Sequence, residues 1–135
     1  MMLDSLAIAA LLRHRPPALL VARELAGVDG RRRFATVARD EWHWTQLLDA
    51  AAQAAGLCVR SDDDALAGRA FVVAAYERVV QASPPGRWRS GVYTIVVWRL
   101  RSFLQMHQFE LRVEGEGEGG PLLAARVTLA PVETS

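Results

Sequence analysis

Lysine is missing from this sequence: all 16 basic residues are arginine, and 15 acidic residues leave a net charge of +1. A chain so close to neutral has no general attraction for nucleic acid, so we expect no nucleic-acid partner. There is one cysteine, Cys58, which has no partner for an intrachain disulfide and no CxxC spacing for zinc. We expect Cys58 to be a small buried hydrophobe.

Long apolar runs are also missing. No segment approaches the roughly 20 apolar residues that span a membrane, so we expect no membrane span. The start of the chain has an acid at position 4 and lacks the basic start of a signal peptide, so we expect a cytoplasmic protein. No P-loop, dinucleotide fingerprint, Ser-His-Asp order or metal motif is found, and we expect no metal and no cofactor. Residues 1–135, 51% hydrophobic, are predicted to form one domain.

The segments that remain suggest a helix, a hairpin, a second helix and then several strands. Prolines end the first helix, Val28-Asp29-Gly30 marks the hairpin turn, and Gly56 is expected to close the alanine-rich second helix. The predicted helices cover residues 5–13 and about 45–55, and the predicted strands cover 19–25, 33–38, 70–80, 92–101, 105–114 and 122–130. This order predicts an α+β fold, in which a curved antiparallel sheet lies against one long helix.

Asp49 and Gln53 are the most informative pair. They are four residues apart in the alanine-rich helix, so they share one helical face. Their neighbours are small and apolar, which predicts a buried helix. A buried carboxylate must be paired, hydrogen-bonded or functional, so Asp49 is the first candidate for chemistry.

Three segments resemble the 3-hydroxyacyl-acyl-carrier-protein dehydratases. Residues 14–23 (HRPPALLVAR) are similar to the opening "PHR-x-P-x-LLVDR" of that family, and residues 48–56 (LDAAAQAAG) to its central-helix pattern "E-A-x-A-Q-A-A-G". Residues 120–129 (GPLLAARVTL) are similar to its last strand. The resemblance implies the hotdog fold, in which a curved antiparallel sheet wraps around one central helix.

The resemblance also implies a chemistry. The substrate is an acyl chain held as a thioester on the phosphopantetheine of an acyl carrier protein. A histidine base and a helix carboxylic acid remove water from the 3-hydroxyacyl group, and a backbone N–H at the helix N-terminus polarises the thioester carbonyl. Asp49 takes the position of the acid, and Gln53 that of a supporting glutamine. Family members are dimers whose sites draw residues from both chains.

The sequence departs from that family where the base is expected. The family histidine lies in a "G-H-F-P-G" segment roughly fourteen residues before the acid, a count that ends here on Ala35. The connector is shortened to residues 39–44, and Thr45 and Gln46 replace a glycine near the helix start. This arrangement is similar to the atypical dehydratase-like hotdogs of bacterial aryl-polyene and xanthomonadin-type pigment clusters.

His43 is the candidate for a replacement base, entering the site from the connector; the alternative is a surface histidine. His14 and His107 are expected to be structural. Trp42 and Trp44 are interpreted either as an aromatic wall for the acyl or aryl group or as dimer packing, and Thr45 as a substrate-binding residue beside them.

Four arginines form a candidate docking patch for an acidic carrier protein: Arg87, Arg89, Arg99 and Arg101. Strand alternation predicts that Arg99 and Arg101 point to one face. The alternative is a solvated sheet surface.

Three functions follow for the chain, all on acyl thioesters. The first is a dehydratase of 3-hydroxyacyl thioesters, either a homodimer or one subunit of a heterodimer whose second hotdog chain supplies the histidine. The second is an acyl thioesterase that uses the same carboxylate. The third is a non-catalytic protein that binds acyl thioesters or acts as a scaffold.

Overall fold

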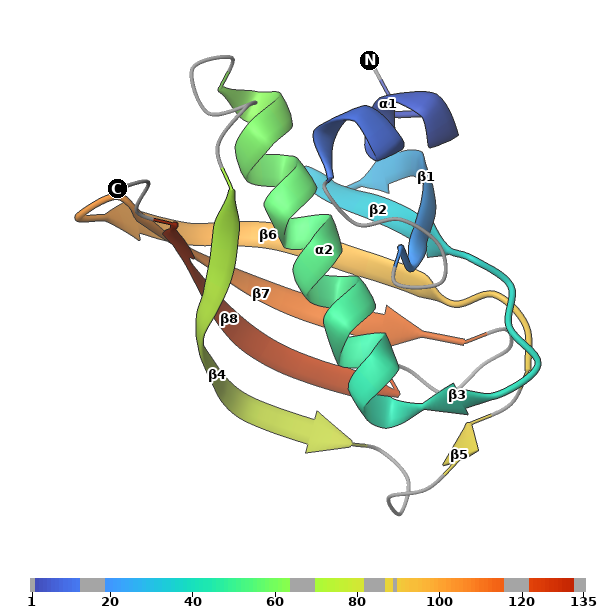
Figure 1. Cartoon of the computed structure of the whole chain (residues 1–135). Coiled ribbons are helices and arrows are strands. Elements are labelled where there is room, and N and C mark those ends of the chain that lie inside the picture. Colours follow the sequence, from blue (N-terminus) through green and yellow to red (C-terminus); the bar gives the residue numbers. More distant parts are fainter. Residues whose placement is uncertain are drawn as a thin grey trace.

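The computed structural model describes residues 2–12, 19–63, 70–81, 87–88, 90–115 and 122–132. A six-stranded antiparallel sheet curves around one long helix, as the sequence predicts (Figure 1). The elements are α1 (Ser5–Leu11), β1 (Val21–Val28), β2 (Arg31–Thr36), β3 (Trp42–His43), α2 (Trp44–Asp62), β4 (Phe71–Gln81), β5 (Arg87–Trp88), β6 (Thr94–Phe103), β7 (Met106–Glu114) and β8 (Leu123–Pro131). In the described part of the chain, no helix is both long and apolar enough to cross a membrane.

The strand order in the main sheet is β1-β2-β6-β7-β8-β4, and β3 and β5 form a separate pair. The turn predicted at Val28-Asp29-Gly30 joins β1 to β2. Asp29 and Gly30 both have positive φ, 53° and 74°, which is the conformation that a two-residue hairpin loop requires. The order places β4 at one edge of the sheet, although it follows α2 directly in the sequence.

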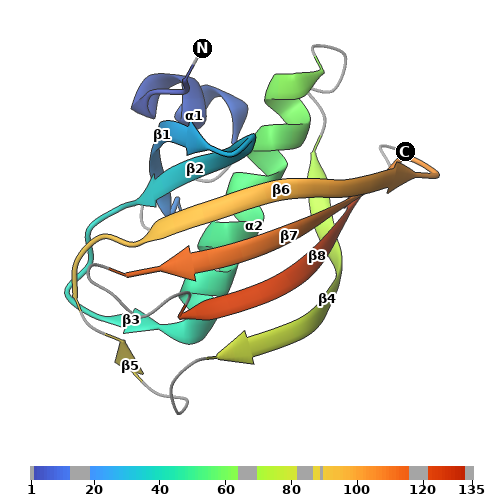
Figure 2. The ribbon, with the colours of Figure 1, turned by 180° about the vertical axis from the view of Figure 1, so that it is seen from behind.

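The core lies between α2 and the concave side of the sheet. Alanines 50, 51, 54 and 55 of α2 are buried there, and their small side chains let the helix lie close to the strands. Opposite them the sheet contributes large buried side chains such as Phe34 and Phe109. The convex side, seen in Figure 2, is covered by none of the described elements.

Helix α2 is longer than predicted, because it continues through Gly56 to Asp62 instead of ending near Ala55. Its final turn is held by Arg32 of β2, which donates to Ser61 Oγ at 2.7 Å and to Asp62 Oδ1 at 2.9 Å. Arg32 also forms a two-bond ion pair with Glu24 of β1. These contacts come from residues about thirty positions away, so local sequence does not reveal them.

The carboxylate of Glu24 is only 8% exposed and also accepts a hydrogen bond from Leu3 N at 3.1 Å. Burial, the largest single influence, opposes ionisation. The hydrogen bonds from Arg32 and Leu3 and the charge of Arg32 outweigh it, so the pKa of Glu24 lies below its ordinary value of 4.5. The ionised carboxylate therefore stabilises the fold above that pH, and this contribution is lost as the pH falls through the lower, folded-state pKa.

We predict that Glu24→Gln lowers the free energy of unfolding at pH 7 by about 1–3 kcal/mol, because it breaks a charged pair that is largely buried. The loss of stability between pH 5 and pH 3 should be shallower in the variant than in the natural chain. Urea unfolding followed at a series of pH values measures both effects. The same change at exposed Glu77 is the control, and equal slopes for Glu24→Gln and the natural chain would contradict the prediction.

Candidate functional site

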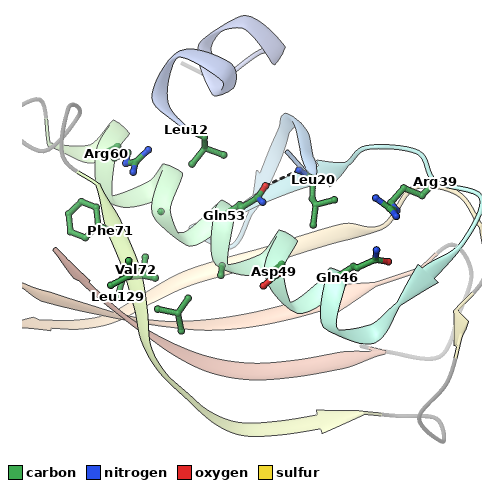
Figure 3. Close-up of a pocket in the computed structure, with 13 residues that line it drawn as sticks. Leu12, Leu20, Arg39, Gln46, Asp49, Gln53, Arg60, Phe71, Val72 and Leu129 are labelled. Atoms are coloured by element: carbon green, nitrogen blue, oxygen red, sulfur yellow. Dashed lines mark hydrogen bonds between the residues drawn. The ribbon is translucent and has the colours of Figure 1, made fainter. Parts of the chain in front are cut away.

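A groove of about 450 Å³ runs along the side of α2 that faces away from the sheet centre. Its walls come from α2, from the edge strand β4 with Leu129 of β8, and from the segments before β1 and after β2 (Figure 3). The lining residues are Leu12, Leu20, Arg39, Gln46, Asp49, Ala52, Gln53, Gly56, Arg60, Phe71, Val72, Val73 and Leu129. Most of these side chains are apolar, and the charged ones are separated along the groove.

Asp49 and Gln53 both line the groove, which confirms that they share one face of the helix. The expectation that Asp49 is buried is wrong for the single chain, where it is exposed. The physical reason is that only the alanine face of α2 packs on the sheet, whereas Asp49 lies on the opposite side. The carboxylate therefore occupies an accessible position part-way along the groove.

Gln53 connects the groove to the start of β1. Its Oε1 accepts a hydrogen bond from Leu20 N at 2.9 Å, and both groups are buried. Because an unpaired buried N–H is costly, this bond fixes the segment before β1 against α2. This contact is structural, and the supporting and substrate-binding role that the resemblance implies for Gln53 stays a prediction.

His43 is the N-cap of α2 and is exposed. Its Nδ1 lies 2.7 Å from Thr45 Oγ1 and accepts from Thr45 N at 3.3 Å, while Gln46 Oε1 accepts from His43 N at 2.9 Å. This reciprocal arrangement is a capping box. It explains why the helix begins at Trp44, and it leaves His43 outside the set of residues that line the groove with Asp49. The catalytic role of His43 and the binding roles of Thr45 and Trp44 stay predictions.

Trp42 is a core residue. It is 0% exposed, its Nε1 donates to Gly91 O at 2.9 Å, and its ring meets Tyr93 edge to face at 5.9 Å between centroids. A side chain without exposed surface contacts neither a substrate nor a partner chain. Both interpretations of Trp42, as a substrate wall and as dimer packing, are therefore wrong.

His107 and Cys58 were expected to have structural roles. Burial, with a smaller effect from Arg99, lowers the pKa of His107, whose ring packs edge to face on Phe71 at 5.7 Å. Cys58 is 2% exposed, which confirms that it is buried, and this burial raises the pKa of its thiol to about 12. His14 lies outside the described residues.

Tyr76 of β4 was missed by the sequence reasoning. It pairs with buried Val127 of β8, so it points to the helix side of the sheet, where it packs against the core. Burial, and then the negative charge of Asp49, raise the pKa of Tyr76 to about 12. Tyr76 therefore lies within the electrostatic influence of the Asp49 carboxylate. Arg39 and Arg60, at the two ends of the groove, were missed as well.

The arginine patch is divided by a β-bulge. Arg99 pairs with Phe109 and Arg101 pairs with Gln108, so an extra residue on β6 reverses the alternation. Arg99 stacks on buried Phe109 on the helix side, whereas Arg101 donates to Gln108 on the convex side. The prediction of a shared face is wrong. The side chain of Arg87 and all of Arg89 lie outside the described residues, and the docking role of the four arginines stays a prediction.

Solved structures share this fold. The dehydratase heterocomplex ApeI:P from Xenorhabdus doucetiae matches with a TM-score of 0.75 and 17% identity, over 93% of this chain and 91% of that chain. A mutant thioesterase from Pseudomonas aeruginosa matches with a TM-score of 0.64 and 19% identity, over 96% and 95%. A hypothetical thioesterase protein with coenzyme A from Streptococcus pneumoniae matches with a TM-score of 0.58 and 18% identity, over 81% and 84%. At these identities the likeness shows the fold alone.

No protein-family model and no curated protein matches the sequence.

We predict that Gln53→Met lowers the free energy of unfolding by about 1–3 kcal/mol, because Leu20 N is left buried without its acceptor. The matched control is Gln46→Met, which removes an exposed capping bond and should cost at most about 1 kcal/mol. Urea unfolding of both variants measures the difference. Equal losses in the two variants would show that the Gln53 bond does not fix the start of β1.

Proposed function

We propose that this protein, which has the hotdog fold that its sequence predicts, is a dehydratase of 3-hydroxyacyl thioesters carried on an acyl carrier protein. The observation that carries the proposal is Asp49, a carboxyl group that lines a largely apolar groove beside the central helix. Among the similar structures is a dehydratase heterocomplex. The thioesterase with coenzyme A supports a pantetheine thioester as the substrate class, since coenzyme A contains pantetheine.

In the proposed reaction, a base removes a proton from C2 of the acyl chain, next to the thioester carbonyl. Asp49 gives a proton to the hydroxyl on C3, the C3–O bond breaks, and water leaves as the C2–C3 double bond forms. A backbone N–H near the start of α2 stabilises the negative charge that develops on the thioester oxygen, assisted by the positive end of the helix dipole. Gln53 holds the segment before β1, which forms one wall of the groove, against the helix that carries Asp49.

We propose that the base comes from a second hotdog chain. Of the described histidines, His43 caps the helix and His107 packs on Phe71, and neither lines the groove. Strand β4 borders the groove at the edge of the sheet, and no described strand pairs with its outer side. Val72 and Val80 of this strand are 52% and 60% exposed. An edge strand with exposed apolar residues is suited to pairing with another chain, which would bring partner residues to Asp49.

The test is to purify the chain alone and together with a candidate second hotdog chain, and to assay both with a 3-hydroxyacyl carrier substrate. We predict enoyl product from the pair, little from the chain alone, and a loss of roughly 10²–10⁴-fold in the pair when Asp49→Asn is introduced. Full activity of the chain alone would rule out the second chain as the source of the base. Unchanged activity in Asp49→Asn would rule out the acid.

The second candidate is an acyl thioesterase, favoured by the thioesterases among the similar structures. There the Asp49 carboxylate would activate a water molecule or attack the thioester carbonyl, and the carrier thiol would leave. The same assay separates the two reactions, because a thioesterase releases free acid and a dehydratase yields an enoyl thioester. Acyl-carrier binding without turnover that survives Asp49→Asn combined with His43→Ala would instead identify a non-catalytic binding protein.

A further inference from the structure

Gly56 is a glycine that neither packing nor backbone conformation explains. It lies inside α2 and is buried, yet a Cβ built on it meets no heavy atom of the described residues within 4 Å apart from its chain neighbours and the backbone of its own helix. At Gly27 the same Cβ would approach Arg31 O at 2.8 Å, and Gly30 has a positive φ that favours glycine. Gly56 has neither feature. It is sheltered from solvent and still borders empty space.

Glycine at this position is unfavourable for the helix. In a helix interior it is roughly fivefold less favourable than alanine, because it loses more backbone freedom on folding. The two preceding residues, Ala54 and Ala55, show that alanine is acceptable in this part of α2. Glycine at position 56 costs helix stability and no close contact requires it. We therefore attribute it to the space that a side chain at this position would fill.

The empty space belongs to the groove. Gly56 lines it together with Asp49 and Gln53, which precede it by seven and three residues on the same side of the helix. The apolar side chains of Leu12, Phe71 and Leu129 also line the groove, and Arg60 lines it one turn of the helix beyond Gly56. The interior part of the groove is therefore suited to a hydrocarbon chain.

We infer that Gly56 determines the length of acyl chain that the groove accepts, an inference that rests on the proposed acyl-thioester substrate. Seven residues of helix separate Gly56 from Asp49, which is about 10 Å. At about 1.2 Å per bond of an extended chain, an acyl group that starts beside Asp49 reaches Gly56 after roughly eight or nine bonds. Longer chains pass over Gly56 and occupy the space that a side chain would fill.

The experiment uses ligands that undergo neither reaction: S-hexyl and S-dodecyl pantetheine thioethers, which contain neither a thioester nor a hydroxyl group on the alkyl chain. Binding is measured by titration calorimetry on the natural chain, Gly56→Ala and Gly56→Leu, with the partner chain present if it is needed for folding. We expect the natural chain to prefer dodecyl over hexyl, since each buried methylene adds roughly fourfold in affinity. That preference should fall at least tenfold in Gly56→Leu and by a smaller factor in Gly56→Ala.

Two further measurements separate a blocked groove from a damaged fold. Gly56→Ala should raise the melting temperature by roughly 3–5 °C while it weakens dodecyl binding, so that stability and long-chain binding change in opposite directions. Ala52→Leu, one turn closer to Asp49, should weaken hexyl and dodecyl binding alike, because it narrows the groove before either chain ends.

A dodecyl preference that is the same in all the Gly56 variants would overturn the inference, as would a natural chain that binds both thioethers equally. Because the ligands do not react, a protein that shows this chain-length effect without turnover would refute the proposed reaction and leave the role of Gly56 intact.

Discussion

The structure depends on the close packing of one face of α2 against the concave side of the sheet. That face consists largely of alanine, so the helix lies near the strands, and Phe34, Phe109 and their neighbours fill the space between them. Once this face is buried, the opposite side of the helix must face outward. Asp49, Gln53 and Gly56 lie on that opposite side, where Asp49 is exposed and Gln53 and Gly56 are buried, and the groove forms there.

Polar contacts then fix both ends of the helix and the wall beside it. The capping box of His43 and Gln46 begins the helix, and the pair of Arg32 with Asp62 holds its last turn to β2. Gln53 joins the middle of the helix to the backbone before β1. Each contact satisfies a group that would otherwise lose a hydrogen bond on folding, so the groove has a defined shape before any ligand enters.

Asp49 lines the groove, but neither of the described histidines does. The base that the proposed dehydration needs is therefore expected to come from a second chain. A helix cap is a poor place for a general base, because the ring nitrogen that accepts from the backbone is occupied. Asp49 lines the groove together with residues of the edge strand β4, which also carries Tyr76, and no described strand covers the outer side of β4. Under the proposed function, a chain that pairs with this edge would supply the groups opposite Asp49.

Much of this protein was determined by local sequence. The strand periodicity, the Asp29–Gly30 turn and the alanine-rich helix were sufficient for the curved sheet and its central helix, and the four-residue spacing was sufficient to put Asp49 and Gln53 on one face. These features depend on neighbours in the chain, so residue order reveals them. The tertiary structure alone decided the exposure of Asp49, the burial of Trp42, the separation of Arg99 from Arg101 and the empty space at Gly56. Each of these depends on strand register or on packing between segments far apart in the sequence, and no local pattern records those contacts.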